Sequence, residues 1–256
     1  MLQIYDPPVL LYMRGDAQIL NLPALGSGGN SEADTVRDRD GGEAGAGELA
    51  TRGVVIVSGM ARGIDTIGYR GAMAVNGQAM GVLGTGIGVG YPKENKKSYK
   101  KVLERGALLS ELPLGTHPAT ENFPVRNRIV AGMPLGIVVL EGAQYRGSLM
   151  TARLAMEFGR EVFGVPGSVT RPVSFAPRQL IKQGAKLVTN AEDVIVKSPT
   201  PIRAALVQAE QPEAEQRNLL PAAGLNRSEK RRYDLLNSDE ALPIDDIVER
   251  SRLNSS

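Results

Sequence analysis

Short apolar runs alternate with amphipathic stretches along most of the chain after residue 53. The runs are rich in Val, Ile and Leu and lie next to glycine, proline or charged residues, at residues 54–57, 79–83, 107–110, 136–140 and 161–165. Runs of this length without polar alternation are typical of strands buried on both faces, as in a parallel sheet. The stretches between them, such as residues 64–75 and 98–105, have the composition of helices. The pattern predicts an α/β fold with an open, mostly parallel, Rossmann-like sheet covered by helices on both faces.

The first of these strands leads into a glycine-containing turn and then a helix, over residues 54–65. Glycine lets the backbone come close to a ligand, and a helix N-terminus favours anions. Ser58, Gly59 and Gly63 are therefore predicted to line a phosphate site, and Arg62 adds positive charge at its mouth. Many α/β proteins use such a turn only to connect a strand to a helix, and the turn by itself does not separate the two interpretations.

A second glycine-rich turn follows the strand at residues 79–83. Gly84 and Gly86 begin it, and Lys93 comes shortly after, in the sequence Tyr-Pro-Lys. Dinucleotide-binding folds also have alternating glycines, with an acidic residue about twenty positions further on. Glu104 is near that position but falls within a predicted helix, so we favour a phosphate site of another kind over NAD. Lys93 is interpreted either as a second cation of that site or as a solvated loop lysine.

Two arginines flank an asparagine at the start of another predicted helix, in residues 123–129. Arg126 and Arg128 thus lie at the positive end of a helix dipole, where a bound anion would explain them. We expect Asn127 to belong to the same site. Phe123 is interpreted either as a platform on which a base stacks or as an apolar residue that packs on the following helix.

Ser148 begins the next helix, whose apolar stripe is expected to face the core. This serine is either a helix cap alone or a cap that also offers its hydroxyl and neighbouring amides to a phosphate. The turns and cations together predict one groove at the carboxyl ends of adjacent strands. The residues predicted to line it are Ser58, Gly59, Arg62, Gly63, Gly84, Gly86, Lys93, Phe123, Arg126, Asn127, Arg128 and Ser148.

Three motifs, SGMARGID at 58–65, FPVRNRI at 123–129 and RGSLMTA at 146–152, resemble the DprA/Smf family of DNA-processing proteins in order and spacing. The resemblance covers about residues 2–196. It implies a Rossmann-like core that binds single-stranded DNA and loads the recombinase RecA onto it in natural transformation and recombination. It also makes the phosphate site a single-strand site and the residues of the groove predicted DNA-binding residues. Lys93 matches a DNA contact of the family. The stretch from Leu180 to Val188 matches the region that forms a homodimer and faces RecA in relatives.

Composition narrows the chemistry that the chain can perform. Its 256 residues carry a net charge of +2 and include no cysteine and one histidine, His117. The absence of cysteine excludes disulfides and thiolate metal sites, and a single histidine disfavours histidine-based triads. No acid/base pair or metal-ligand cluster accompanies the motifs, so we expect no catalytic residue, metal or cofactor. The sequence has no membrane-length apolar run and no signal peptide pattern, which predicts a cytoplasmic protein without a membrane partner.

Residues 25–47 interrupt the pattern, because they are rich in Gly, Asp, Glu and Arg and have almost no apolar periodicity. We expect this segment to lack regular structure and to replace the family's first strand, its Gly-Ser/Thr-Arg turn and its first helix. If residues 30–46 are written as codons and read one nucleotide later, the genetic code allows Thr-Pro-Lys-Pro-Thr-Pro-Tyr-Gly, the missing family motif. We therefore hypothesise that residues 26–46 are frame-shifted.

The expected organisation has five parts: an extended lead-in at 1–24, the anomalous segment at 25–47, the Rossmann-like core at 48–197, a linker at 198–225 and a partial winged helix at 226–256. By comparison with the family, we expect the N-terminal helical domain to be absent and the C-terminal winged helix to be incomplete.

Two alternatives to a DNA-binding function remain. The core is also similar to that of the nucleotide-processing phosphoribohydrolases called LOG or lysine-decarboxylase-like proteins. Their Pro-Gly-Gly-X-Gly-Thr motif and catalytic glutamate are not found here in the matching arrangement. The chain could also be an inactive remnant of a DprA gene.

Overall fold

The computed structural model describes residues 4–29, 36–143, 147–200 and 203–204. They belong to one compact unit, Met1–Pro212. A second unit, Glu213–Ser256, lies outside the described residues, and so do the predicted partial winged helix and most of the predicted linker.

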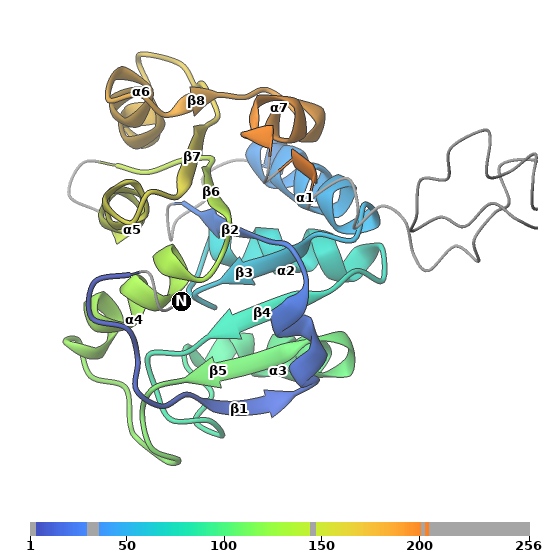
Figure 1. The fold of residues 1–256 in the computed structure, drawn as a ribbon, viewed down its shortest axis with the longest axis vertical. Coiled ribbons are helices and arrows are strands. Elements are labelled where there is room, and N and C mark those ends of the chain that lie inside the picture. The colour runs from blue at the N-terminus through green and yellow to red at the C-terminus, as the bar shows by residue number, and fades with distance from the viewer. Residues whose placement is uncertain (1–3, 30–35, 144–146, 201–202, 205–256) are drawn as a thin grey trace, which may run out of the picture. The chain divides into compact units, whose positions relative to one another are not determined.

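Within the described residues, eight strands form one sheet in the order β1-β5-β4-β3-β2-β6-β7-β8 (Figure 1). The strands are β1 (Tyr12–Gly15), β2 (Ala24–Gly28), β3 (Val55–Ser58), β4 (Ala79–Val82), β5 (Ala107–Ser110), β6 (Gly136–Val139), β7 (Glu161–Gly164) and β8 (Lys186–Leu187). Neighbouring strands are parallel, except that β1 pairs antiparallel with β5 at one edge. The predicted open, mostly parallel sheet is confirmed. The order of strands reverses between β2 and β6, which makes this pair the topological switch point.

Helices cover both faces of the sheet (Figure 1). One face carries α1 (Val36–Thr51), α2 (Ile64–Ala74), α3 (Lys96–Arg105) and α7 (Ala191–Lys197). The other face carries α4 (Asn122–Gly132), α5 (Gly147–Glu157) and α6 (Phe175–Lys182). Three short 3₁₀ helices in the described residues complete the connections: η1 (Ala17–Asn21), η2 (Lys93–Asn95) and η3 (Pro172–Ser174).

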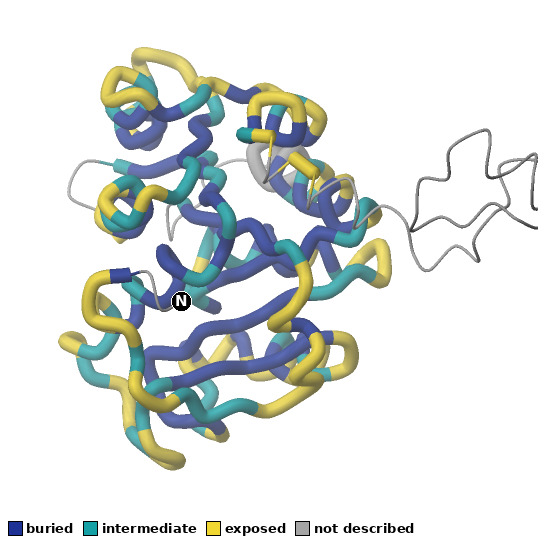
Figure 2. The backbone as a smooth tube through the Cα atoms, viewed as in Figure 1, coloured by how far each residue is buried: buried dark blue, intermediate teal, exposed yellow. Residues whose placement is uncertain are grey.

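Alternate side chains of the central strands supply the cores on the two faces, and Figure 2 shows these strands buried along their length. In β3, Ile56 belongs to the same apolar cluster as Leu49 of α1. Val55 and Val57 point the other way and cluster with Ile129 of α4. This two-sided burial is why the strand is a continuous apolar run without polar alternation.

The structure differs from the prediction in residues 25–47, for which we expected no regular structure. Ala24–Gly28 is β2, a central strand, and α1 includes residues 36–47. All of β2 is buried between β3 and β6, with which it pairs in parallel. Ladder hydrogen bonds use backbone groups alone, so two flanking strands can incorporate a strand made of small residues. The prediction failed because it used side-chain periodicity as the only signal for a strand.

Helix α1 forms in spite of several internal glycines, each of which costs about 0.5–1 kcal/mol relative to alanine. Its C-terminal turns bury Ala46, Leu49 and Ala50 in the core. Close packing on α2 adds to this, because a Cβ placed on Gly71 would lie 2.2 Å from the carbonyl oxygen of Glu43. Tertiary packing therefore outweighs the low helix propensity of this segment.

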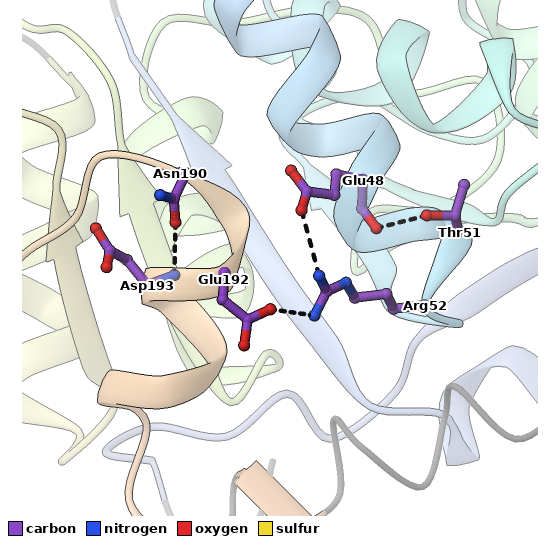
Figure 3. A network of polar contacts seen from close by, with 6 residues as sticks. All are labelled: Glu48, Thr51, Arg52, Asn190, Glu192 and Asp193. Carbon is purple, nitrogen blue, oxygen red and sulfur yellow. Dashed lines mark hydrogen bonds and ion pairs between the residues drawn. The ribbon is translucent and has the colours of Figure 1, made fainter.

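The end of α1 is also joined to α7 by polar contacts (Figure 3). The guanidinium of Arg52 donates to Glu192 at 2.6 Å and to Glu48 at 3.3 Å. The first turn of α7 is capped by Asn190, whose side-chain oxygen accepts from the amide of Asp193 at 2.8 Å. These contacts connect two helices on one face of the sheet through a partly exposed arginine.

Candidate nucleic-acid interface

The β3–α2 turn has a specific backbone conformation that the side chain of Ser58 supports. The Ser58 hydroxyl accepts from the amide of Met60 at 3.0 Å and donates to the carbonyl of Asp65 at 3.2 Å. Met60 and Gly63 both have positive φ, 57° and 76°. Ser58 is completely buried, so its role here is to close the turn.

A carboxylate from the protein itself lies against the amides of this turn. Asp65, in the first turn of α2, accepts from the amide of Ala61 at 3.3 Å and from that of Gly59. Burial raises the pKa of Asp65, and the positive charge of Arg126 and the two amides act in the opposite direction. The prediction assigned these amides to a bound phosphate, whereas the structure places the Asp65 carboxylate beside them.

Arg126 is buried and joins the carboxyl ends of two strands. Its guanidinium donates to the carbonyls of Gly59 after β3 and Val82 at the end of β4, and its Nε donates to Asn127 at 3.2 Å. A Cβ on Gly59 would lie 2.8 Å from both Arg126 Nη1 and Asp65 Oδ2, so a side chain at this position would displace one of these two groups. Burial lowers the pKa of Arg126. Arg126, which is predicted to lie along the groove, is thus an internal brace beside the buried carboxyl group of Asp65.

Arg128 is held by two carboxylates. Its Nη2 donates to both oxygens of Glu111, at 2.7 and 2.9 Å, and its Nε donates to Asp6 at 3.0 Å. The side chain is only 13% exposed. Protein carboxylates therefore balance this cation, which the prediction had assigned to a bound phosphate.

The other two predicted cations lie on the surface. Arg62 is 63% exposed, and its ion pair with Glu94, at 2.8 Å, is equally open to solvent. Such pairs contribute about 0–1 kcal/mol, so Arg62 can exchange Glu94 for a phosphate at little cost. Lys93 is exposed and makes no ion pair with any residue that the structure describes. These two residues come from the β3–α2 turn and from the connection that follows β4.

The glycines after β4 make room for protein groups. Gly84 lies under the ring of Phe123, because a Cβ there would come within 2.6 Å of the ring. Gly86 donates its amide to the carbonyl of Thr116 at 2.9 Å. Phe123 in turn lies 5.5 Å from Tyr91, centroid to centroid, with the rings tilted by 32°. Phe123 thus lies between Gly84 on one side and Tyr91 on the other. Tyr91, the outer member of the aromatic pair, is 45% exposed.

Asn127 and Ser148 lie near the start of α5. A Cβ on Gly147 would be 3.8 Å from the side-chain nitrogen of Asn127. The hydroxyl of Ser148 is buried and has no hydrogen-bond partner among the described residues, which leave out its near neighbours 144–146. Asn127 also accepts from Arg126, which in turn donates to Gly59, so it is connected to the β3–α2 turn.

A cavity of about 540 Å³ lies at the switch point, between α1, α7 and the sheet. Leu25, Ser27, Gly45, Glu141 and Arg171 are among its lining residues. Glu141 and Arg171 form an ion pair at 3.2 Å. The predicted DNA-binding residues do not line this cavity, which is bounded in part by the glycine-rich face of α1.

Sequence reasoning missed three residues that organise the turn and its surroundings: Asp65, Asn95 and Tyr91. Asn95 donates its side-chain amide to the carbonyls of Met60 and Ala61, at 3.0 and 3.2 Å. Asp65 ends the SGMARGID motif, so a signal for it was available in the sequence. No signal in the sequence alone indicates that Asn95 contacts a turn more than thirty residues earlier.

The part of the chain that the structure describes contains no cluster of three or more His, Cys, Asp or Glu side chains able to hold a metal ion. Across the same residues, no helix combines the length and apolar character needed to cross a bilayer.

Fold and surface define the class of protein: a doubly wound α/β protein with exposed cations beside the turns at the carboxyl ends of its strands. A family model described as DNA recombination-mediator protein A matches residues 1–199. The chain belongs to this family.

Two relatives and two solved structures support this assignment. The chain is 43% identical over 196 residues to Protein Smf of Escherichia coli (strain K12), covering 76% of this chain and 52% of that protein. It is 40% identical over 199 residues to DNA processing protein DprA of Streptococcus pneumoniae, covering 76% and 68%. The X-ray structure of the Streptococcus pneumoniae protein matches with a TM-score of 0.73 and 38% identity, over 77% of this chain and 69% of that one. DNA processing protein A from Helicobacter pylori, a single-stranded DNA-binding protein, matches with a TM-score of 0.69 and 27% identity, over 75% and 87%.

The chain thus spans about half the length of the Escherichia coli relative and about two thirds of the Streptococcus pneumoniae protein.

Proposed function

We propose that this chain binds single-stranded DNA on the surface formed by the β3–α2 turn and the connection into α3, without performing chemistry on it. The observation that carries the proposal is the exposure of Arg62 and Lys93 beside the carboxyl ends of neighbouring strands. Open α/β sheets take their ligands at this edge. Family membership and the DNA-binding relative from Helicobacter pylori support the same assignment.

The chemistry of this surface suits a phosphate backbone. Arginine offers a planar fork of donors for phosphate oxygens, and lysine offers a mobile point charge. Tyr91 and Phe123 supply an aromatic surface on which a base can stack without regard to sequence. The proposed contacts are therefore Arg62, Lys93 and the Tyr91–Phe123 pair, while Arg126 and Asp65 hold the turn in shape.

Binding of a fluorescent oligo-dT at several salt concentrations, with duplex DNA as competitor, tests the proposal. Affinity should fall as salt rises, and the duplex should compete weakly. Arg62→Ala should reduce the slope of log affinity against log salt by about 0.7, the value for one lost phosphate contact on a single strand. Arg153→Ala, a change of equal charge at an exposed position of α5, is the matched control and should leave the slope unchanged. A folded chain that does not bind oligo-dT, or equal slopes for the two variants, would contradict the proposal.

In this proposal the bound strand is protected and transferred to RecA during recombination and transformation, and the chain acts as a homodimer. The predicted dimer region, residues 180–188, contains the edge strand β8. Leu180, Ala185 and Val188 are buried in this region, whereas Leu187 is 42% exposed. Leu187→Asp should therefore shift the sedimentation of a dimer to that of a monomer. Strand exchange by RecA on coated DNA, with and without the chain, tests the transfer.

The absence of chemistry is part of the proposal and has its own test. Incubation with AMP-type nucleotides should release no free base. Release of base would favour an enzyme similar to the LOG phosphoribohydrolases.

Residues 26–46 require a separate control. A cooperative melting curve on purified protein would argue against an inactive remnant. Resequencing the gene tests the frame-shift hypothesis, since a clean read in the present frame from an expressed protein contradicts it.

A further inference from the structure

Helix α3 carries lysines along one face. Lys96, Lys97, Lys100 and Lys101 follow Lys93 at intervals of three and four residues, and all five are exposed. This spacing puts them on the same side of a helix. Tyr99 and Val102 occupy the opposite side and are buried in the core. We call this set of five lysines the lysine face.

The lysine face carries an excess of positive charge, because its five lysines share this side of the helix with one exposed carboxylate, Glu104, four residues after Lys100. None of its members forms an ion pair with a carboxylate in the described ranges, in contrast to Arg62, Arg128 and Lys186 elsewhere on the unit. Like charges four residues apart destabilise a helix by about 0.2–0.5 kcal/mol for each pair. The helix thus tolerates unfavourable repulsion that a bound polyanion would relieve.

The lysine face begins at the proposed DNA-binding surface. Glu94, next to Lys93, pairs with Arg62 at 2.8 Å, and Asn95 is hydrogen-bonded to the backbone of the β3–α2 turn. Tyr69 of α2 is hydrogen-bonded to Ser98 of α3 at 2.8 Å, which fixes the two helices together. From this fixed start, α3 extends for about 15 Å, given the rise of 1.5 Å per helical residue. A strand that leaves the turn in this direction meets one lysine after another.

We propose that the lysine face binds the sugar-phosphate backbone of the same DNA strand beyond the turn, and so lengthens the footprint of the protein. This inference rests on the proposed function. Lysine ammonium groups on flexible stems contact phosphates without reading sequence, so the lysine face adds affinity and salt dependence without specificity. Short strands held only by the turn and Lys93 should not reach the lysines of α3.

The test compares two lengths of fluorescent oligo-dT, about five and about twenty nucleotides, which bracket typical single-strand site sizes. On the long strand, Lys97→Gln with Lys101→Gln should reduce the salt slope by about 1.4, or about 0.7 for each cation lost. On the short strand the same variant should match the wild type. A matched double variant, Arg153→Gln with Arg203→Gln, removes two exposed cations outside α3 and outside residues 180–188, and should change neither slope. Glutamine keeps the helix propensity of lysine, and circular dichroism checks that α3 remains folded.

Each outcome separates this inference from the proposed function. A wild-type chain that binds neither length contradicts both. A wild-type chain that binds both lengths, with an unchanged slope in the Lys97/Lys101 variant, overturns the lysine face alone and leaves the turn as the DNA site. The same unchanged slope is expected if the lysine face binds an acidic protein and not DNA.

Discussion

The β3–α2 turn and helix α1 follow two neighbouring strands, β3 and β2, and are held by different kinds of interaction. Directional polar contacts from Ser58, Asp65, Asn95 and Arg126 fix the turn. Close packing on α2 and a few buried residues near its end fix α1. The segments that follow two neighbouring strands can thus be held in place in different ways, one by polar contacts and the other by close packing.

The largest effect is expected where charge specifies the turn. Arg126→Met removes the donors to Gly59 and Val82 and leaves the buried carboxylate of Asp65 without its cation. Each buried carbonyl left without its donor costs about 1–3 kcal/mol, so for the two carbonyls we expect a loss of about 2–6 kcal/mol in the free energy of unfolding. Urea denaturation followed by circular dichroism measures it.

The double variant Asp65→Asn with Arg126→Met is the control. It removes both charges, so part of the lost stability should return relative to Arg126→Met alone. A loss below about 1 kcal/mol in the single variant would mean that Arg126 is no more than a solvated surface cation, because exposed pairs contribute about that much at most.

Where shape specifies α1, an added methyl group should act next most strongly. Gly71→Ala places its Cβ against the carbonyl of Glu43, a backbone group that cannot move without shifting the helix. Overpacking of this kind costs about 1–3 kcal/mol, measured again by urea denaturation. An unchanged midpoint would show that the two helices are separated more widely than in the structure.

The turn could be predicted from the sequence to the extent that its residues act locally. The strand and the helix follow from the spacing of residues 54–65, whereas the sequence assigns Gly59 to a phosphate site and not to its place beside Arg126 and Asp65. The role of Arg126 could not be predicted, because Gly59 is 67 residues away and the sequence gives no sign of which charges meet. The motif therefore identified the important residues more successfully than it identified what each one contacts.

Residues 25–47 could not be predicted because their structure depends on packing against other elements and not on a local sequence pattern. A search for apolar periodicity finds nothing in β2 or most of α1, because their positions depend on β3, β6 and α2. Glycine at positions 42, 45 and 47 indicated a loop by composition. In the structure Gly42 and Gly47 allow α1 to approach α2, and Gly42 and Gly45 border the cavity at the switch point.

Gly45→Ala tests the role of these glycines with a substitution that should stabilise the protein. A Cβ at this position meets no atom within 4 Å, in contrast to Gly71. The substitution should therefore raise the free energy of unfolding by about 0.5–1 kcal/mol, the difference in helix propensity between the two residues. In thermal melts, the midpoint temperature should be higher than that of the wild type for Gly45→Ala and lower for Gly71→Ala. A loss of stability in Gly45→Ala would contradict the helix itself.

The smallest effect concerns pH and returns to the turn. Burial raises the pKa of Asp65 above its ordinary value of 3.8, so the folded chain keeps this proton to higher pH than the unfolded chain does. The contribution of Asp65 to stability is therefore fully present below pH 3.8 and is lost as pH rises through the folded pKa. The difference in unfolding free energy between the wild type and Asp65→Asn, measured by urea denaturation from acid to neutral pH, should decrease over that interval. Arginine stays protonated over this pH range, so the changed contacts of Arg126 alter the free-energy difference by a constant amount. The slope of that difference against pH therefore reports the titration of Asp65. A difference that grows with pH would mean that the Arg126 charge and the turn amides dominate over burial, and that the turn is stabilised by an ionised carboxylate.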